Sequence, residues 1–286
     1  MERGILAMTV GLGLLASACA GPGPTGPATK AADRWTRPLI VAHRGGAALA
    51  PENTLAAFEN ALRIGVDMVE LDVHLSLDGA VVVMHDSDLS RTTDGKGRVG
   101  ELPLDELLRL NAAATFRGPS FGSQAVPTLA DVLRLVKDKA GAQIEIKTVD
   151  GKRYPGIEEK VLAKVAEYGM TDNVVIISFD FETIKTARAL NPRVATGALA
   201  SREYFLRRPL ERPEKIMEDI FSLKADYFMP QYSYASDALV QAAHKTGIKV
   251  GVWTVNDETA MAKMRDLGVD AITSDRPDLL KEVLGR

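Results

Sequence analysis

From residue 39 onward, short apolar runs with strand character alternate with amphipathic helical patterns, and this alternation constrains the possible folds most. The predicted parallel strands are residues 39–43, 67–73, 142–147, 174–179, 194–199, 226–230, 249–255 and 270–274. The predicted helices are residues 54–64, 128–139, 156–168, 181–190, 211–222, 236–245 and 257–266, with a last helix after Pro277. Near-continuous apolar strands are typical of parallel sheets buried on both faces. The pattern therefore predicts an α/β protein built as a closed (β/α)8 TIM barrel.

An open, doubly wound sheet is the alternative fold. It is less favoured because no Gly-rich phosphate loop follows the first strand. The chain has 286 residues, and barrels of about 250 residues commonly form one domain. The net charge is -3 and the pI is about 5.9, with no basic block. We therefore expect no nucleic-acid partner.

One apolar run does not fit the barrel. Residues 80–84 follow the strand 67–77 after only Asp78-Gly79, a dipeptide typical of two-residue hairpin turns. A parallel crossover needs about a dozen residues or more, so this run is predicted to return antiparallel, outside the barrel. A two-residue turn would place His85 opposite Asp72, with Cβ atoms about 5 Å apart.

The domain organisation follows from composition. Residues 1–18 are predicted to be a signal peptide, because their apolar run is too short for a membrane span of about 20 residues. Residues 19–37 are rich in Gly, Pro, Ala and Thr and are predicted to be a flexible tether. Residues 38–286 form the predicted barrel domain. Within it, residues 87–126 match neither pattern and are interpreted as a small insertion over one mouth.

Cys19 is the only cysteine in the chain. The stretch "LLASAC" that ends at it resembles a bacterial lipoprotein signal, in which this cysteine is lipidated and becomes the new N-terminus. Ala16-Ser17-Ala18 also has the small-x-small form of an ordinary signal-peptidase site, which is the alternative. We expect an exported protein of the periplasm or cell envelope, attached to the membrane by a lipid anchor only.

Polar residues stand where the predicted strands end, and in a barrel the carboxyl ends of the strands carry the function. Residues two apart in a strand share a face, so Glu70 and Asp72 point the same way, as do Glu145 and Lys147. The strand-end residues considered as site candidates are His43, Arg44, Glu70, Asp72, Glu145, Lys147 and Trp253.

Three carboxylates that converge in one mouth would repel each other and lose hydration. A divalent cation removes this difficulty, and oxygen ligands suit Mg²⁺ or Ca²⁺ better than zinc. The fixed positive charges of Arg44 and Lys147 suit a phosphate group. Ion pairs between these two side chains and the carboxylates are the alternative. His43 and His85 could divide the work of base and acid near neutral pH.

The motifs "HRGG…PENT", "ELDV…DG…VVVMHD", "EIK", "WTVN" and "SDRP" occur in this order between residues 39 and 279. In this combination the sequence resembles the glycerophosphodiester phosphodiesterase family, which implies a (β/α)8 barrel with a small insertion. By motif, the resemblance implies Glu70, Asp72 and Glu145 as metal ligands, His43 and His85 as the acid–base pair, Arg44 and Lys147 as phosphate-binding residues, and Trp253 as a wall of the substrate pocket.

The resemblance implies metal-dependent hydrolysis of glycerophosphodiesters to glycerol 3-phosphate and an alcohol, through a cyclic phosphate, with direct attack by water as the alternative. We assign His43 as base and His85 as acid, and the reverse assignment is left open. A metal-dependent barrel lyase or aldolase is one alternative. A non-catalytic lipoprotein that binds phospholipid head groups is another. The preferred alcohol, the choice between Mg²⁺ and Ca²⁺, and the oligomeric state are left open.

Three polar residues near the predicted site are expected to be structural. His74 is interpreted as a surface residue of the hairpin beyond the barrel rim. Asp275 is interpreted as a helix cap before Arg276-Pro277. For Asn256, two interpretations have equal weight: the N-cap of the helix that follows it, or a site residue at the end of its strand.

Overall fold

The computed structural model describes residues 1–2, 38–209 and 211–286. The predicted lipidation site, Cys19, and almost all of the predicted signal peptide and tether lie outside the described residues. The barrel begins at the first strand, Leu39.

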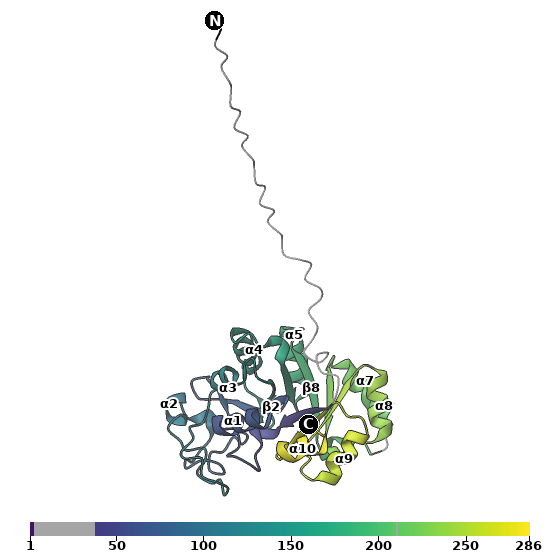
Figure 1. The fold of residues 1–286 in the computed structure, drawn as a ribbon. Coiled ribbons are helices and arrows are strands. Elements are labelled where there is room, and N and C mark those ends of the chain that lie inside the picture. The colour runs from purple at the N-terminus through teal and green to yellow at the C-terminus, as the bar shows by residue number, and fades with distance from the viewer. Residues whose placement is uncertain (3–37, 210) are drawn as a thin grey trace.

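In the described part of the chain, eight parallel strands close into a barrel, which confirms the predicted fold (Figure 1). The order is β1-β11-β10-β9-β8-β7-β4-β2, and β2 pairs with β1 to close the ring. The strands are β1 (Leu39–Ala42), β2 (Met68–Leu75), β4 (Gly141–Ile146), β7 (Val174–Ser178), β8 (Ala195–Ala200), β9 (Tyr227–Pro230), β10 (Lys249–Val252) and β11 (Ala271–Ser274). Each lies within about three residues of a predicted strand.

Helices surround the strands on all sides (Figure 1). They are α1 (Leu55–Ile64), α2 (Leu104–Leu107), α3 (Leu129–Val136), α4 (Ile157–Glu167), α5 (Phe181–Leu190), α6 (Arg202–Leu206), α7 (Pro213–Ser222), α8 (Asp237–Lys245), α9 (Glu258–Asp266) and α10 (Pro277–Val283). Side chains of Thr54, Thr128, Asp180, Ser236 and Asp257 cap five of them, each by accepting a backbone N–H of the first turn. The sequence did not predict α6 or the small hairpin of β5 (Thr148–Val149) and β6 (Lys152–Arg153).

Alternation along the strands divides the apolar core into two parts. Side chains on one face, such as Leu71 and Val73 of β2, pack against the surrounding helices. Side chains on the other face fill the barrel interior, where Met68, Val175 and Tyr227 lie in one buried cluster. Met68, Glu70 and Asp72 are two residues apart in β2, so both carboxylates share the interior face.

The hairpin of β2 and β3 (Val81–Val83) is antiparallel as predicted, but its register is wrong by one residue. His74 pairs with Val82. The turn between Ser76 and Ala80 therefore contains three residues, not two, and the Ser76 N–H donates to the Ala80 carbonyl over 3.0 Å. The reason lies in the insertion, because the Asp78 carboxylate accepts hydrogen bonds from the Ser76 hydroxyl and from a backbone N–H at the start of α2.

As a consequence, Met84 rather than His85 opposes Asp72, and its N–H donates to the Asp72 carbonyl over 3.0 Å. The Met84 side chain packs into a separate apolar cluster with Leu89 and Val99 of the insertion. β3 ends at Val83, so His85 lies beyond the hairpin and not opposite Asp72. It still lines the barrel mouth, as predicted, because the chain turns after the strand.

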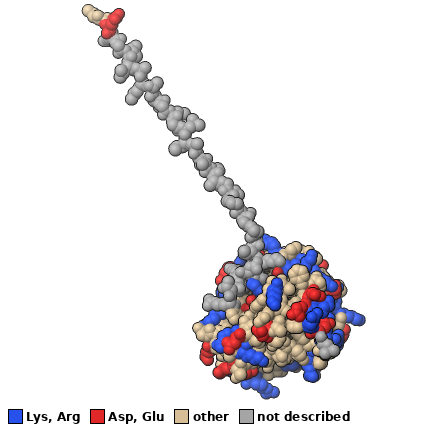
Figure 2. Space-filling model, turned by 90° about the vertical axis from the view of Figure 1, so that its right-hand side faces the viewer, with Lys and Arg blue, Asp and Glu red and all other residues tan. Residues whose placement is uncertain are grey.

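No helix in residues 38–209 or 211–286 is long and apolar enough to cross a membrane. On the face of the molecule seen in Figure 2, acidic and basic side chains of the described residues are interspersed.

The packing of α1 against the first strand's turn predicts a large effect of truncating Phe58. This side chain is fully buried in the outer core and lies against Gly45 of the turn. We expect Phe58→Ala to lower the free energy of unfolding by about 3–5 kcal/mol in urea titrations. Phe221→Ala in α7 is the matched control, because Phe221 is 61% exposed, and should cost no more than about 0.5 kcal/mol. Equal effects of the two substitutions would contradict this packing.

Candidate active site

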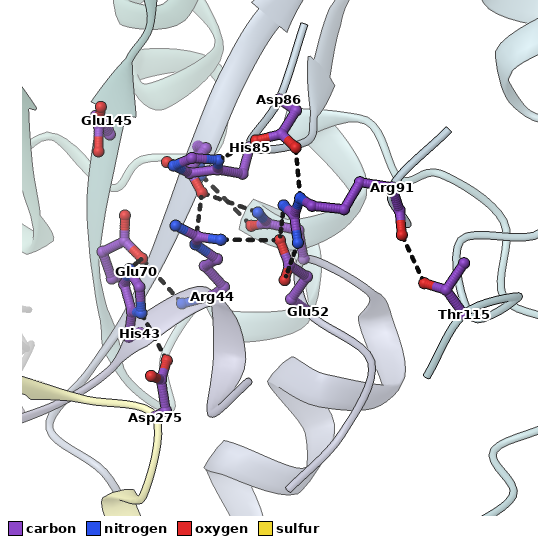
Figure 3. A network of polar contacts seen from close by, with 12 residues as sticks. His43, Arg44, Glu52, Glu70, His85, Asp86, Arg91, Thr115, Glu145 and Asp275 are labelled. Carbon is purple, nitrogen blue, oxygen red and sulfur yellow. Dashed lines mark hydrogen bonds and ion pairs between the residues drawn. The ribbon is translucent and has the colours of Figure 1, made fainter. Parts of the chain in front are cut away.

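One pocket opens at the carboxyl ends of the barrel strands and collects most of the predicted site residues. Figure 3 shows the polar groups around it, among them His43, Arg44, Glu70, His85 and Glu145. The polar side of the pocket carries both predicted catalytic histidines, Arg44 and two of the predicted metal ligands. Its apolar side is formed by side chains from β7, β8 and β9 and by Trp253. The lining residues are His43, Arg44, Glu70, His85, Gln143, Glu145, Ile177, Phe179, Leu199, Met229, Trp253, Thr254 and Thr273.

Three buried carboxylates form a cluster at the polar side of this pocket. Glu70 and Asp72 extend from β2, and Glu145 extends from the neighbouring β4, where it is the register partner of Asp72. One oxygen from each of the three lies within 4.8 Å of the other two. Asp72 is fully buried and the other two are nearly so.

The mutual repulsion of these carboxylates is visible in their proton affinities. Burial, with the nearby charge of Asp72, raises the pKa of Glu70 to about 8. The same two causes raise the pKa of Glu145 to about 7, against the opposing charge of Lys147. Burial alone would raise the pKa of Asp72 too, but Lys147 and the other nearby positive groups outweigh it and hold that pKa well below its usual range.

The residues fit a hard divalent cation. All three candidate ligands offer oxygen, and Asp72 Oδ1 is buried with no hydrogen bond, its charged neighbour being the Lys147 ammonium at 3.2 Å. Glu70 Oε2 is oriented by the backbone N–H of Arg44, which donates to it over 2.9 Å. The Asn53 amide donates to Asp72 Oδ2 over 2.9 Å, so the second oxygen of that carboxylate is fixed as well.

Positive side chains also lie at the cluster. Lys147 Nζ lies 2.7 Å from Glu145 Oε1 and 3.2 Å from Asp72 Oδ1, and Arg44 Nε lies 3.6 Å from Asp72 Oδ2. The ion pairs considered as an alternative to a metal site are therefore present. They leave Glu70 and Glu145 with raised pKa values, so these cations alone do not compensate the buried negative charge.

A tight turn after β1 presents His43 and Arg44 to the cluster. Arg44 has a φ of +50°, the left-handed region that non-glycine residues seldom adopt. Gly45 follows with a φ of +83°, and a Cβ there would lie 2.7 Å from the Ala57 side chain of α1. A strained residue at such a place is typical of a functional site, where the surrounding structure holds it.

His43 is held by a carboxylate from the far end of the chain. Its Nδ1–H donates to Asp275 Oδ1 over 2.6 Å, and its Nε2 lies 4.0 Å from Glu70 Oε2. Burial acts to lower the pKa of His43, but the Asp275 hydrogen bond and the charge of Glu70 outweigh it and raise that pKa. Asn256 orients this carboxylate in turn, because its amide donates to Asp275 Oδ2 over 2.7 Å.

The structure therefore corrects two structural interpretations. Asp275 is not a helix cap, because Arg276 is the N-cap of α10 and the Asp275 side chain binds His43 instead. Asn256 is not the N-cap of α9, because the Asp257 side chain accepts the capping N–H. The contact between His43 and Asp275 forms because β1 lies beside β11 in the closed barrel. The sequence around either residue gives no sign of this contact.

His85 is held in a similar way by its neighbour in sequence. Its Nδ1–H donates to Asp86 Oδ1 over 2.5 Å. Burial lowers the pKa of His85, with the charges of Lys147 and Arg44 acting in the same direction. In both histidines the Nδ1 atom is engaged by a carboxylate, which leaves Nε2 for proton transfer.

The expectation that His74 lies on the hairpin surface is wrong. Its side chain is buried, and its Nε2–H donates to the His85 carbonyl over 3.0 Å. Burial lowers the pKa of His74 to about 4, so the ring is neutral and its Nδ1 accepts from the Tyr154 hydroxyl over 3.0 Å. The insertion and the loop after β6 cover the rim that the prediction left open.

Trp253 lies where the prediction placed it, in the apolar wall of the pocket. Its indole N–H donates to the Met229 carbonyl over 2.8 Å, which fixes the ring. Phe179 meets it edge to face at 5.3 Å between ring centroids.

Gln143 also lines the pocket, although it was not predicted from the sequence. Its buried Oε1 has no hydrogen-bond partner. Because Gln143 stands two residues before Glu145 in β4, it shares the interior face with Glu145, and this spacing could have identified it from the sequence.

Residues 43–279 match the Glycerophosphoryl diester phosphodiesterase family. A glycerophosphodiester phosphodiesterase of Caldanaerobacter subterraneus subsp. tengcongensis is 37% identical over 245 residues, which are 85% of this chain and 96% of that protein.

Two solved structures are also similar. One is a phosphodiesterase of Oleispira antarctica in complex with the product sn-glycerol-3-phosphate. It superposes with a TM-score of 0.75 at 29% identity, and the superposition covers 90% of this chain and 100% of that protein. A glycerophosphodiester phosphodiesterase of Agrobacterium tumefaciens has a TM-score of 0.70 at 30% identity, with 85% and 99% covered. The chain therefore belongs to the glycerophosphoryl diester phosphodiesterase family.

Proposed function

We propose that this chain is a metal-dependent phosphodiesterase that hydrolyses glycerophosphodiesters to glycerol 3-phosphate and an alcohol. The observation that carries the proposal is one pocket in which the buried cluster of Glu70, Asp72 and Glu145 faces two histidines held by carboxylates. Relatives within the family bear the name of this enzyme, and the Oleispira antarctica protein was solved with glycerol 3-phosphate.

Glu70, Asp72 and Glu145 would hold the divalent cation, Mg²⁺ or Ca²⁺, since both take oxygen ligands. When bound, the cation supplies Lewis-acid chemistry and neutralises negative charge at the reacting phosphate. Arg44 and Lys147 bind the phosphoryl oxygens and keep the diester oriented in the mouth.

The reaction then needs two proton transfers. His43 takes the proton of the glycerol 2-hydroxyl, whose oxygen attacks phosphorus, and the bond to the leaving alcohol breaks. His85 gives a proton to that alcohol oxygen, leaving a cyclic phosphate. Water opens the ring with the two roles exchanged, and glycerol 3-phosphate leaves.

The geometry supports His43 as the first base. Its Nε2 lies beside Glu70, next to the place where a glycerol hydroxyl would meet the carboxylate cluster. Asp275 stabilises the imidazolium that forms when His43 takes the proton.

The apolar wall would carry the uncharged part of the substrate. Trp253 and Phe179 offer ring surface to the carbon skeleton of the glycerol or of the alcohol, opposite the phosphate side of the pocket.

Two alternatives receive less support. A lyase or aldolase would use the same carboxylates to stabilise an enolate, and it has no need of two histidines with separate carboxylate partners. A head-group-binding lipoprotein would have no need of two histidines in one pocket, each held at Nδ1 by a carboxylate.

We also propose that the barrel domain, residues 38–286, works at the cell envelope. Its support is the sequence pattern alone: residues 1–18 as a signal peptide of lipoprotein type, Cys19 as the lipidated residue and residues 19–37 as the tether. Such an anchor would keep the barrel close to the membrane whose deacylated lipids are the substrate class.

The proposal is tested by release of glycerol 3-phosphate from glycerophosphocholine, glycerophosphoethanolamine, glycerophosphoglycerol and glycerophosphoinositol. We expect release from at least one substrate, loss of release with EDTA, and recovery with Mg²⁺ or Ca²⁺. Glu70→Gln should abolish recovery. Glu158→Gln is the matched control, because Glu158 is a buried carboxylate paired with Arg153 outside the site. Release from none of the substrates would contradict the proposal, and release that EDTA leaves unchanged would contradict its metal dependence.

The acid–base scheme predicts a specific loss for His85→Ala. Removing one positioned acid or base should lower kcat by about 10²–10⁴. His244→Ala is the control, because the His244 ring lies 2.9 Å from Asp270, which precedes β11 at the opposite end of the barrel. Its kcat should match that of the unmodified protein. Full activity in the His85→Ala variant would contradict the acid–base mechanism.

A further inference from the structure

Arg91, in the insertion, is the residue that the sequence motifs and the proposed mechanism leave without a role. Its guanidinium contacts two carboxylates on different parts of the chain (Figure 3). One is Asp86, which also holds His85. The other is Glu52, which also holds Arg44.

The contacts to Glu52 form a bidentate pair. Arg91 Nη1 donates to Glu52 Oε2 over 2.9 Å, and Nη2 donates to Oε1 over 2.7 Å. Glu52 Oε1 also accepts from Arg44 Nη1 over 3.0 Å. One carboxylate is thus shared by two guanidinium groups, and its position fixes the Arg44 side chain beside Asp72.

The third nitrogen of the Arg91 guanidinium completes the bridge. Its Nε–H donates to Asp86 Oδ2, while the other oxygen of Asp86 accepts the Nδ1–H of His85. Each oxygen of the Asp86 carboxylate therefore accepts one hydrogen bond, and the His85 ring cannot rotate without breaking its bond to Asp86. The backbone at Arg91 is itself held, because the Thr115 hydroxyl donates to the Arg91 carbonyl over 2.7 Å.

We propose that Arg91 is a positioning residue that sets His85 through Asp86 and Arg44 through Glu52. The insertion thereby orients the proposed acid and one proposed phosphate ligand with a single planar, permanently charged group. This inference rests on the proposed function. Without Arg91, two negative carboxylates would face each other, and neither would hold its catalytic neighbour in one orientation.

The test compares Arg91→Ala with Arg98→Ala. Arg98 lies in the same insertion, its side chain is equally exposed at 46%, and it pairs with Asp150 outside the site. We expect Arg91→Ala to lower kcat by about 10–100-fold, the usual cost of losing a residue that orients a catalytic group. Arg98→Ala should keep the kcat of the unmodified protein, because single exposed ion pairs contribute little. Equal kcat values in the two variants would overturn the inference.

A second comparison separates positioning from a general structural effect. If Arg91 acts on His85 through Asp86, its removal in an Asp86→Asn background should lower kcat less than in the unmodified protein, and the loss that remains reports the route through Glu52. Equal losses in both backgrounds would overturn the proposed route. Should Arg91→Ala fail to fold, Arg91→Lys replaces it, because one ammonium cannot serve both carboxylates. Unchanged kcat in the lysine variant would then overturn the inference.

These outcomes are distinct from failure of the proposed function. An unmodified protein that releases no glycerol 3-phosphate removes the proposed function. An active protein in which Arg91→Ala and Arg98→Ala behave alike removes only the role of Arg91.

Discussion

The repulsion among three buried carboxylates is the constraint on which the rest of the site depends. Glu70, Asp72 and Glu145 share one end of the barrel because β2 and β4 are neighbours whose inward-facing residues are in register. Burial makes their charges expensive, and the raised pKa values of Glu70 and Glu145 show that Lys147 and Arg44 compensate them only in part. A divalent cation is the simplest group that would complete the compensation.

Around this cluster, carboxylates hold the groups that would move protons or bind phosphate. Asp275 holds His43, Asp86 holds His85 and Glu52 holds Arg44. Asp86 and Glu52 lie near their partners in sequence and are joined by Arg91 of the insertion, whereas Asp275 reaches His43 only when the barrel has closed. Closure brings β11 beside β1, and the separate apolar cluster around Leu89 seats the insertion at the mouth.

The fold and the central residues could be predicted because strand periodicity and motif order are local properties. His85 lines the pocket at the barrel mouth, although the predicted hairpin register was wrong. A two-residue turn is the intrinsic preference of Asp78-Gly79, but Asp78 is bound to Ser76 and to the start of α2, and this tertiary contact selects a three-residue turn. His74 was assigned to the surface because nothing in its own strand shows that Tyr154 and the insertion cover it.

The most direct test of the account is the coupling between cation binding and protons. Because Glu70 and Glu145 have pKa values of about 8 and 7 without a cation, metal binding near neutral pH must displace protons from the cluster. Calorimetric titration with Mg²⁺ or Ca²⁺ in buffers of different ionisation enthalpy measures the number of protons released per cation bound. We expect proton release at pH 7, less release at pH 9, and tighter cation binding as the pH rises between 6 and 8. Binding without proton release, or with an affinity independent of pH, would contradict the account.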